Sequence, residues 1–411
     1  MPRNAAHRTI LISGAGIAGL TLAHWLRRYG FDVTVVEYAP APRPGGQAVG
    51  LGGVAKDVAT HMGVLPDIDS ARAPGRGLAY VNASGKRKAS IPAPLFDGEA
   101  AVAEIEILRG DLIGILYAVA NEDVEYLFGD SITDILETPE GVEVTFGRNE
   151  SHVFDLVVGA DGLHSNVREL VFGSEAQFVH HLGAYLAFFT IPADGLELDD
   201  GFLLHNAPGG LLAAIRTEGA DTAQAMLGFK APALDYDRHD IVGQQRIVAE
   251  RFSGVGWHAA HLLDSMGQAP DFYFDSLSHT RMHRWSRGRV ALIGDAGYSG
   301  SPLSGNGTAM AMVGAYVLAG ELARSRDDYL TAYGRYLKLL RPFVIECQKL
   351  PRGGVNGFLP SSRIAIAARN LSVRVMTSAP MRGVPAKSLQ KSGSITLPDY
   401  REYASSDVSR P

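Results

Sequence analysis

Residues 9–37 read TILISGAGIAGLTLAHWLRRYGFDVTVVE, and this stretch decides the fold. Its apolar start, TILIS, is typical of a buried strand, and the strand enters a glycine-rich turn of the form GxGxxG. Residues 20–29 predict a helix, which Gly30 ends, and residues 32–36 predict a second strand. Together these elements form a complete βαβ unit, so the sequence predicts an α/β fold built on an open, mostly parallel sheet.

The glycines and the acid of this unit predict a dinucleotide site. We expect Gly14 to make the tight turn, Gly16 to let the backbone approach a pyrophosphate, and Gly19 to allow close packing of helix on strand. Free N–H groups at the start of the helix stabilise phosphates, and Glu37 can accept hydrogen bonds from both hydroxyls of an adenosine ribose. The alternative is an ordinary glycine-rich turn, and the unit alone does not distinguish FAD from NAD.

Two later segments each place an aspartate directly after a predicted strand. The sequence GAD ends at Asp161 after residues 154–158, and GDA begins at Gly294 after residues 289–293. The carboxyl end of a buried strand lies at the ligand edge of an open α/β sheet, so Asp295 is expected to contact the cofactor. Asp161 is explained equally well as a cofactor contact or as a helix-capping residue. Ser165 predicts a helix cap, and Arg168 predicts a link between its helix and a neighbouring element.

The three motifs, GxGxxG with its acid, DGxxSxxR and GDA, resemble those of the class A flavoprotein monooxygenases with the para-hydroxybenzoate hydroxylase fold. The resemblance covers about residues 9–322, with the motifs in the family's order. It implies a Rossmann-like FAD-binding domain, a discontinuous and mostly antiparallel-sheet substrate domain, and C-terminal helices. Within this family, the chain resembles the small tetracycline-inactivating monooxygenases.

The resemblance also implies roles for individual residues. It implies that Asp295 bonds a ribityl hydroxyl of FAD and that Asp161 and Gly162 lie near the pyrophosphate and the nicotinamide approach. It further implies that Arg43 contacts the adenosine part and Arg109 the flavin. The complete set of expected cofactor contacts is Gly14, Gly16, Gly19, Glu37, Arg43, Arg109, Asp161, Gly162, Gly294, Asp295, Pro302, Gly305, Asn306 and Gly307. No catalytic side chain or metal ligand is expected, because the flavin carries the chemistry.

The loop at residues 301–307, SPLSGNG, precedes a predicted helix rich in Ala, Gly and Met. The positive end of that helix would stabilise negative charge on the reduced flavin ring. The family pattern GDAAHxxxPxxGQGxN is altered here, since Tyr298 stands where His is usual and Asn306 replaces Gln. Pro302, Gly305 and Gly307 keep the backbone features of the loop. Tyr298 either lines the active site or packs in the core.

The sequence predicts a division of the chain into three parts. The FAD-binding domain is expected to comprise residues 1–75, 103–175 and 281–322, and the substrate domain residues 76–102 and 176–280. Alternating apolar runs separated by turn residues predict the strands of the second domain. Residues 323–411 are expected to form C-terminal helices and a polar tail. His205 and Arg216, on the predicted sheet, are interpreted mainly as surface residues.

Composition excludes several classes of protein. The chain has 411 residues and a net charge of -6, which gives no electrostatic basis for binding nucleic acid or an anionic membrane. Its single cysteine, Cys347, cannot form an internal disulfide, and a reducing cytoplasm is expected. No apolar run is long enough for a membrane helix. We expect a monomer or a homodimer.

The activity implied by the resemblance is oxygen insertion into a bulky aromatic or enolic substrate, such as a polyketide or a tetracycline. NADPH or NADH would reduce FAD as a transient co-substrate, and O2 would form a flavin C4a-hydroperoxide. Two alternatives remain, an FAD-linked reductase or dehydrogenase without oxygen insertion and a non-enzymatic prenyl-protein escort. A halogenase is disfavoured, because the Trp-x-Trp-x-Ile-Pro motif is absent.

Overall fold

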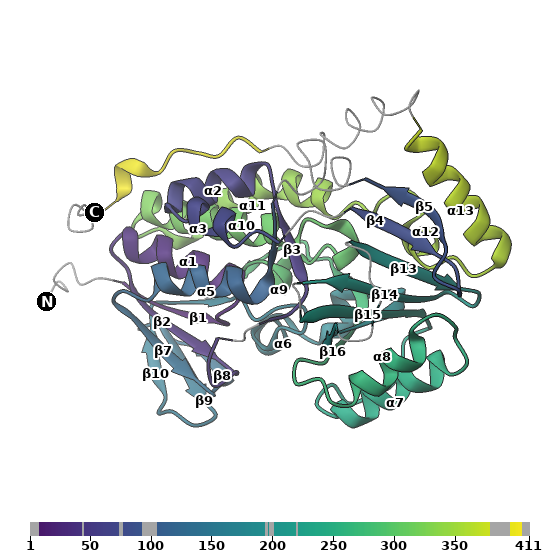
Figure 1. Ribbon diagram of the computed structural model, residues 1–411. Coiled ribbons are helices and arrows are strands. Elements are labelled where there is room, and N and C mark those ends of the chain that lie inside the picture. Colours follow the sequence, from purple (N-terminus) through teal and green to yellow (C-terminus); the bar gives the residue numbers. More distant parts are fainter. Residues whose placement is uncertain are drawn as a thin grey trace, which may run out of the picture.

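The predicted βαβ unit forms the centre of a six-stranded sheet (Figure 1). The computed structural model describes residues 8–42, 45–73, 77–92, 105–193, 196, 201–218, 221–378 and 395–404. The order of the strands in this sheet is β17 (Ser286–Arg287), β18 (Val290–Leu292), β11 (Leu156–Gly159), β1 (Thr9–Ser13), β2 (Asp32–Glu37) and β7 (Val124–Phe128). Neighbouring strands are parallel except for β17 and β18, so the carboxyl ends of β1, β2, β11 and β18 share one edge.

Helices cover one face of this sheet (Figure 1). The helix of the βαβ unit, α1 (Ile17–Arg28), packs against α5 (Arg109–Ala120) and α10 (Gly307–Ser325). Helix α10 also contacts α2 (Val54–Met62) and α11 (Tyr329–Cys347), and α3 (Leu65–Ser70) lies beside α2 and α5. Because α10 is enclosed on all sides, its small residues are needed for close packing. A Cβ atom on Gly314 would overlap the Tyr298 hydroxyl.

Smaller elements complete this part of the chain. A three-stranded antiparallel sheet, β8 (Ile132–Glu137), β9 (Val142–Phe146) and β10 (His152–Phe154), covers the opposite face of the parallel sheet, together with α6 (Asn166–Phe172). Strands β3 (Ala48–Leu51) and β6 (Ile105–Leu108) form a separate antiparallel pair. The three-stranded sheet and the β3–β6 pair were not predicted from the sequence.

A seven-stranded sheet forms the second part, in the order β16 (Tyr273–Thr280), β12 (Val179–Pro192), β15 (Thr222–Lys230), β14 (Leu211–Thr217), β13 (Phe202–Ala207), β4 (Leu78–Val81) and β5 (Arg87–Ile91). All neighbours are antiparallel except β13 and β4, as expected for a mostly antiparallel sheet. Alternate residues of a strand face opposite sides, and both sides are apolar here because helices pack on part of each. Phe189 faces α7 (Ile241–Phe252) and α8 (Ala259–Met266), whereas Leu186 faces the side of α12 (Gly354–Phe358).

The C-terminal residues depart from the expected polar tail. Helix α13 (Arg363–Met376) is one of the expected C-terminal helices, and it lies along β5. Further on, residues 395–404 return to the first part of the molecule and end in the short helix η4 (Arg401–Tyr403). Tyr400 is only 1% exposed and belongs to the main core, so this segment is a packed part of the fold.

Neither a membrane-spanning helix nor a cluster of metal-binding side chains is found among the described residues. None of their helices combines the length and the apolar character that crossing a membrane requires. Nor do they contain a group of three or more His, Cys, Asp or Glu side chains placed to hold a metal ion.

Candidate cofactor site

The glycine-rich turn between β1 and α1 has three glycines in three different environments. Gly14 has a φ of +106°, and a Cβ atom there would lie 2.6 Å from the Ala160 carbonyl oxygen. A Cβ on Gly19 would overlap the carbonyl of Gly14, so the helix can approach the strand only without a side chain. At Gly16 a Cβ would meet no atom within 4 Å. Protein atoms therefore occupy the space beside Gly14 and Gly19, whereas Gly16 borders open space.

Glu37 lies at the end of β2, and the backbone holds its carboxylate in place. Its Oε2 accepts a hydrogen bond from the amide of Ala15 and its Oε1 accepts one from the amide of Ala39, both at 2.8 Å. An ionised carboxylate has about four acceptor sites, so it can still accept hydroxyl groups of a ligand. The first of these bonds joins the acid to the glycine turn.

The other two motifs lie at the same sheet edge as the glycine turn. The amide of Ala160 donates to the carbonyl of Ser13 at 2.8 Å, next to Gly14. Gly294 has a φ of +59°, and a Cβ atom on it would lie 3.0 Å from the Cβ of Ala18 in α1. The three segments that the sequence assigned to a cofactor are therefore neighbours, as parallel strands with a common carboxyl edge require.

Asp295, Arg109 and Tyr273 come together from three elements. Asp295 begins α9 (Asp295–Tyr298), Arg109 begins α5, and Tyr273 begins β16. Burial raises the pKa of Asp295, and the positive charge of Arg109 partly offsets this. Burial also raises the pKa of Tyr273, as do the carboxylates of Asp275 and Asp295, whereas the charge of Arg109 lowers it. All three side chains are nevertheless exposed, Tyr273 by 44%. The three side chains interact electrostatically, solvent reaches each of them, and Asp295 belongs to a cofactor motif; we call the place where they meet the recess.

Asp161 caps the helix that follows it. Its Oδ2 accepts a hydrogen bond from the amide of Val167 at 3.0 Å, and its Oδ1 accepts one from the Ser165 hydroxyl at 2.5 Å. Ser165 in turn accepts from the amide of Arg168 and is the N-cap of α6, as predicted. Next to Asp161, Gly162 has a φ of +83°, which favours glycine. The capping explanation of Asp161 is thus realised, and its cofactor contact stays a prediction.

Arg168 links α6 to the GDA segment, which confirms the predicted structural role. Its side chain is fully buried, and it donates to the carbonyl oxygens of Ala296 at 2.9 Å and Leu163 at 2.6 Å. It also pairs with Glu175 at 3.3 Å. The DGxxSxxR and GDA motifs are therefore joined directly by a hydrogen bond.

The loop before α10 lies between the two parts of the molecule. It contains the short helix η2 (Pro302–Ser304), and its Leu303 packs on the apolar face of the seven-stranded sheet. Gly305 has a φ of +68° and Gly307, the first residue of α10, borders open space. The Asn306 amide donates to the carbonyls of Ser304 and Cys347, at 2.8 and 3.3 Å, so this side chain is bound within the protein.

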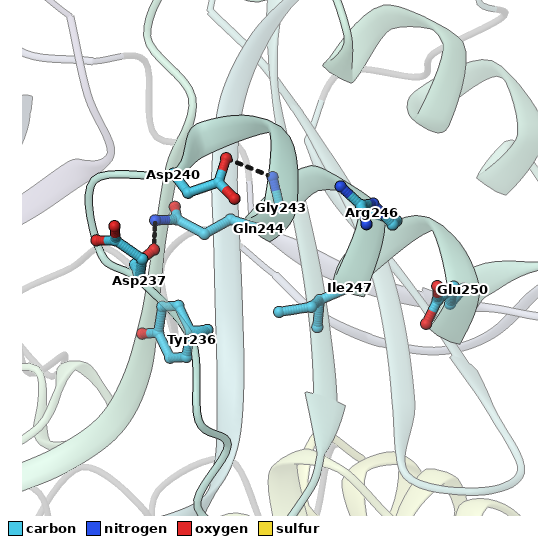
Figure 2. A pocket seen from close by; sticks show the side chains of 8 residues that line it. All are labelled: Tyr236, Asp237, Asp240, Gly243, Gln244, Arg246, Ile247 and Glu250. Atoms are coloured by element: carbon cyan, nitrogen blue, oxygen red, sulfur yellow. Dashed lines mark hydrogen bonds between the residues drawn. The ribbon is translucent and has the colours of Figure 1, made fainter.

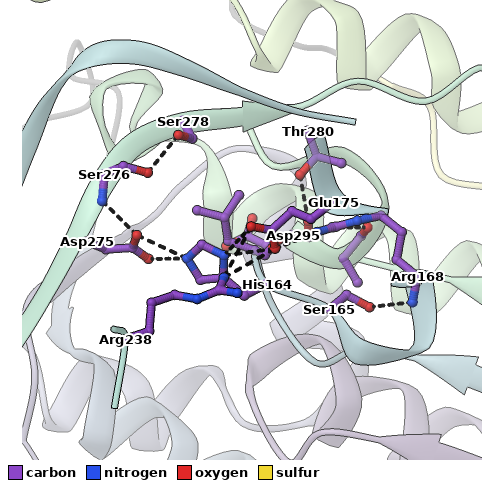
Figure 3. Close-up of polar contacts among 12 residues, drawn as sticks. His164, Ser165, Arg168, Glu175, Arg238, Asp275, Ser276, Ser278, Thr280 and Asp295 are labelled. Atoms are coloured by element: carbon purple, nitrogen blue, oxygen red, sulfur yellow. Dashed lines mark hydrogen bonds and ion pairs between the residues drawn. The ribbon is translucent and has the colours of Figure 1, made fainter. Parts of the chain in front are cut away.

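A charged cluster beside these motifs was not predicted from the sequence (Figure 3). His164 lies in the turn after β11, with Glu175 in η1 (Glu175–Gln177) 2.9 Å from its Nδ1 and Asp275 in β16 3.1 Å from its Nε2. Burial alone would lower the pKa of His164, but the hydrogen bonds to the two carboxylates raise it to about 9. No local pattern indicates this cluster, because Asp275 reaches His164 only through the folding of β16.

Two side chains differ from their sequence interpretation, a third agrees with one of its two alternatives, and a fourth lies outside the described residues. His205 is 6% exposed and bonds the carbonyl of Val81, and Arg216 is half-buried with a 2.7 Å ion pair to Glu106, so the surface interpretation of both is wrong. Tyr298 is 1% exposed and lies in the core, with its hydroxyl 3.0 Å from that of Tyr336. Its packing role is thus the correct alternative. Arg43 lies outside the described residues.

A separate pocket of about 310 Å³ is lined by residues of α7 and of the segment before it (Figure 2). Asp240 caps this helix by accepting a 2.9 Å hydrogen bond from the amide of Gly243, and the Gln244 side chain donates to the carbonyl of Asp237 at 3.0 Å. The residues that line the pocket are Tyr236, Asp237, Asp240, Gly243, Gln244, Arg246, Ile247 and Glu250. It includes none of the motif residues, and Asp240 is used there as a helix cap.

Known proteins resemble the chain over most of its length. A family model described as "FAD binding domain" matches residues 7–329. An uncharacterized protein of Mycobacterium tuberculosis is 43% identical over 357 residues, which cover 86% of this chain and 95% of that protein. A flavin-dependent monooxygenase of Legionella longbeachae serogroup 1 (strain NSW150) is 36% identical over 392 residues, 95% of this chain and 98% of that one.

A solved structure gives the same result for the fold. The crystal structure of tetracycline destructase Tet(51) has a TM-score of 0.80 and 35% sequence identity, and the match covers 97% of this chain and 100% of that one. The family model and the relatives agree with the three motifs at the edge of the parallel sheet, so the chain belongs to the FAD-binding-domain family of flavin-dependent monooxygenases.

Proposed function

We propose that the protein uses NADPH or NADH and O2 to insert one oxygen atom into a bulky aromatic or enolic substrate. One observation carries the proposal. The recess joins Asp295, whose neighbour Gly294 lies against Ala18 of α1, to Tyr273, which begins β16 of the seven-stranded sheet. A cofactor and an apolar substrate would meet at such a junction.

The residues at the sheet edge fit FAD. Gly16 borders the open space that a pyrophosphate needs, and α1 starts there with unpaired N–H groups. Glu37 is held with free acceptor capacity for a ribose, and Asp295 is exposed in the recess. We propose that these residues hold FAD together with Gly14, Gly19, Arg109, Asp161, Gly162, Gly294, Pro302, Gly305, Gly307 and Arg43. Bound FAD would supply the redox and oxygen chemistry.

For Asn306 we limit the proposed role to the shape of the loop. Its side-chain amide donates to two carbonyl groups of the protein. Its conformation would keep Gly305 and Gly307 in position, and the start of α10 would place a partial positive charge beside the flavin ring. The chain thereby stabilises negative charge on the ring without a cationic side chain at this point.

The substrate would lie against the apolar side of the seven-stranded sheet that Leu303 contacts. Phe188, Phe202 and Tyr80 are partly buried there, and the guanidinium of Arg369 in α13 lies 3.6 Å from the ring centre of Tyr80. Aromatic and aliphatic groups of this kind suit a large, planar, mostly apolar molecule better than a small acid. The likeness to tetracycline destructase Tet(51) supports a tetracycline or a related polyketide.

The predicted domain division becomes part of this proposal. Residues 1–75, 103–175 and 281–322 would bind FAD, residues 76–102 and 176–280 would bind substrate, and residues 323–411 would support both. NADPH or NADH would dock transiently, since the part of the chain that the structure describes has one parallel sheet, with a single glycine-rich βαβ unit.

The test starts with the visible spectrum of the purified protein. NADPH and NADH oxidation would then be measured with and without a panel of tetracyclines and polyphenols, with mass spectrometry of the products. A yellow protein, faster NAD(P)H oxidation with one compound and a mass gain of about 16 units in that compound are the expected results, because one oxygen atom is added. Consumption of a compound without oxygen gain would indicate a reductase or dehydrogenase. A colourless protein that takes up no FAD would indicate a binding protein.

A further inference from the structure

The charged cluster at His164 connects the two parts of the molecule (Figure 3). His164 follows β11 of the parallel sheet, whereas Asp275 belongs to β16, the edge strand of the seven-stranded sheet. At the far end of β16, the Thr280 hydroxyl donates a 3.1 Å hydrogen bond to the carbonyl of Asp295. Strand β16 is therefore attached to the cofactor motifs at two places along its length.

Asp275 also orients a residue of the recess. The Tyr273 hydroxyl donates a 2.8 Å hydrogen bond to Oδ2 of Asp275, whose side chain is only 10% exposed. Residues two apart in a strand point to the same side, so Tyr273 and Asp275 share the side that faces His164. The Tyr273 phenol belongs to the recess with Asp295 and Arg109, and the charges of both affect its pKa. A continuous chain of contacts thus runs from His164 through Asp275 to Tyr273.

The groups around His164 favour its charged form. The carboxylates of Glu175 and Asp275 lie on the two sides of its ring. Two cations, Arg168 and Arg238, both pair with Glu175, at 3.3 and 3.2 Å. Among the described residues, Glu175 thus has Arg168 and Arg238 as further cationic partners, whereas the ion pair of Asp275 is the one with His164. A buried carboxylate of this kind is costly when its partner is lost.

We propose that His164 is a positioning residue of the flavin site: held as a cation between Glu175 and Asp275, it fixes β16 and the Tyr273 phenol against the turn that follows β11. The inference rests on the proposed function, since it takes the recess as the place where FAD binds. The alternative is an ion pair that stabilises the fold and has no effect on the recess.

The test uses full-length protein and the variants His164→Gln, Tyr273→Phe and the double variant, with His239→Gln as the matched control. His239 also faces an aspartate, Asp237 at 3.4 Å, but its side chain is 81% exposed. The dissociation constant of FAD is measured by flavin fluorescence quenching at pH 7.5. Each single variant is expected to raise it about tenfold, and the double variant by the same factor, because both changes break one chain of contacts. The control is expected to stay within about twofold of wild type.

A pH series adds a readout that a purely structural role would not change. The dissociation constant of the wild type should rise between pH 8 and 10, as His164 loses its proton near its pKa of about 9. The same series with His164→Gln is the baseline, because it contains the titration of FAD itself. The dissociation constant of this variant should not show the rise. Multiplying effects in the double variant, or a lower melting temperature with unchanged FAD affinity, would overturn the proposal.

A variant that does not fold and a wild type that does not oxygenate its substrate are both distinguished from a failure of the role of His164. Should His164→Gln not fold, Asp275→Asn takes its place with the same expectations, since it retains the shape of the side chain and removes the charge that pairs with His164. FAD binding is measured without substrate, so a wild type that binds FAD but oxygenates nothing contradicts only the proposed reaction. A wild type and a His164→Gln variant with equal FAD affinity at all pH values contradict only the role of His164.

Discussion

The guanidinium of Arg168 donates a 2.9 Å hydrogen bond to the carbonyl oxygen of Ala296, and so joins two motifs that lie far apart in the sequence. Arg168 belongs to the DGxxSxxR motif and Ala296 directly follows Asp295. The arginine is fully buried, and its second terminal nitrogen bonds Leu163 and Glu175. The conformation of the GDA turn thus depends on a side chain from the other motif.

Replacing Arg168 with lysine is expected to weaken both the fold and the cofactor site. Lysine keeps the charge but cannot reproduce a planar donor that bonds two carbonyl groups at once. The free energy of unfolding, from urea denaturation, should fall by about 2 kcal/mol, and FAD affinity should fall with it. Arg287→Lys is the control, because exposed Arg287 also bonds one carbonyl, that of Val171 at 2.7 Å. Equal losses in the two variants would contradict the role assigned to Arg168.

Gly16→Ala separates cofactor binding from folding. In the structure a Cβ atom at this position meets nothing within 4 Å, and its φ of -82° suits any residue. The variant should therefore melt at the temperature of the wild type in the absence of FAD. A pyrophosphate lying against this backbone would meet the methyl group, so the dissociation constant of FAD should rise at least about tenfold. Gly334→Ala, on the exposed side of α11 with equal space around it, should leave FAD affinity unchanged.

Asp295→Asn should give opposite effects on stability and on FAD binding. Burial raises the pKa of this carboxyl in the folded protein, so its ionised form costs stability at neutral pH rather than adding to it. The FAD-free variant is expected to be as stable as the wild type or more stable at pH 7.5. FAD affinity should fall about tenfold, because a charged acceptor is lost. The exposed Asp134→Asn serves as the control, and a variant with unchanged affinity would remove Asp295 from the proposed site.

The parts that were predictable from the sequence depend on short-range patterns. The βαβ unit from Thr9 to Glu37 was predictable because strand, turn and helix signals lie within one segment, and Ser165 was recognised as a cap from its place before a helix. The contact between His164 and Asp275 was not predictable, because their separation in the chain carries no periodic signal. The surface interpretation of His205 was wrong because the polarity of a side chain does not show whether a backbone carbonyl in the core is placed to bond it, as that of Val81 is here.

The packing of residues 395–404 was likewise not predictable from the local sequence. Residues 395–404 follow a polar stretch, yet Tyr400 fills a space beside Gly320 of α10, where a Cβ atom would overlap its ring. Its hydroxyl donates a 2.7 Å hydrogen bond to Oε1 of Glu321, which is 1% exposed. Among the described residues, the cation paired with that carboxylate is Arg335, at 3.9 Å. Tyr400 is therefore the main partner of a buried acid on the helix that begins at the flavin loop.

Two substitutions of Tyr400 separate its hydrogen bond from its packing. Tyr400→Phe keeps the ring and leaves Oε1 of Glu321 without its donor, so the free energy of unfolding should fall by about 2 kcal/mol. Tyr400→Ala also empties the space beside Gly320 and should cost about 4 kcal/mol. Combining Tyr400→Phe with Glu321→Gln should recover part of the first loss, since a neutral amide is cheaper to bury than a carboxylate without a donor. Urea denaturation of the four proteins measures these differences, and a Tyr400→Ala variant as stable as wild type would show that the C-terminal segment does not pack on α10 in solution.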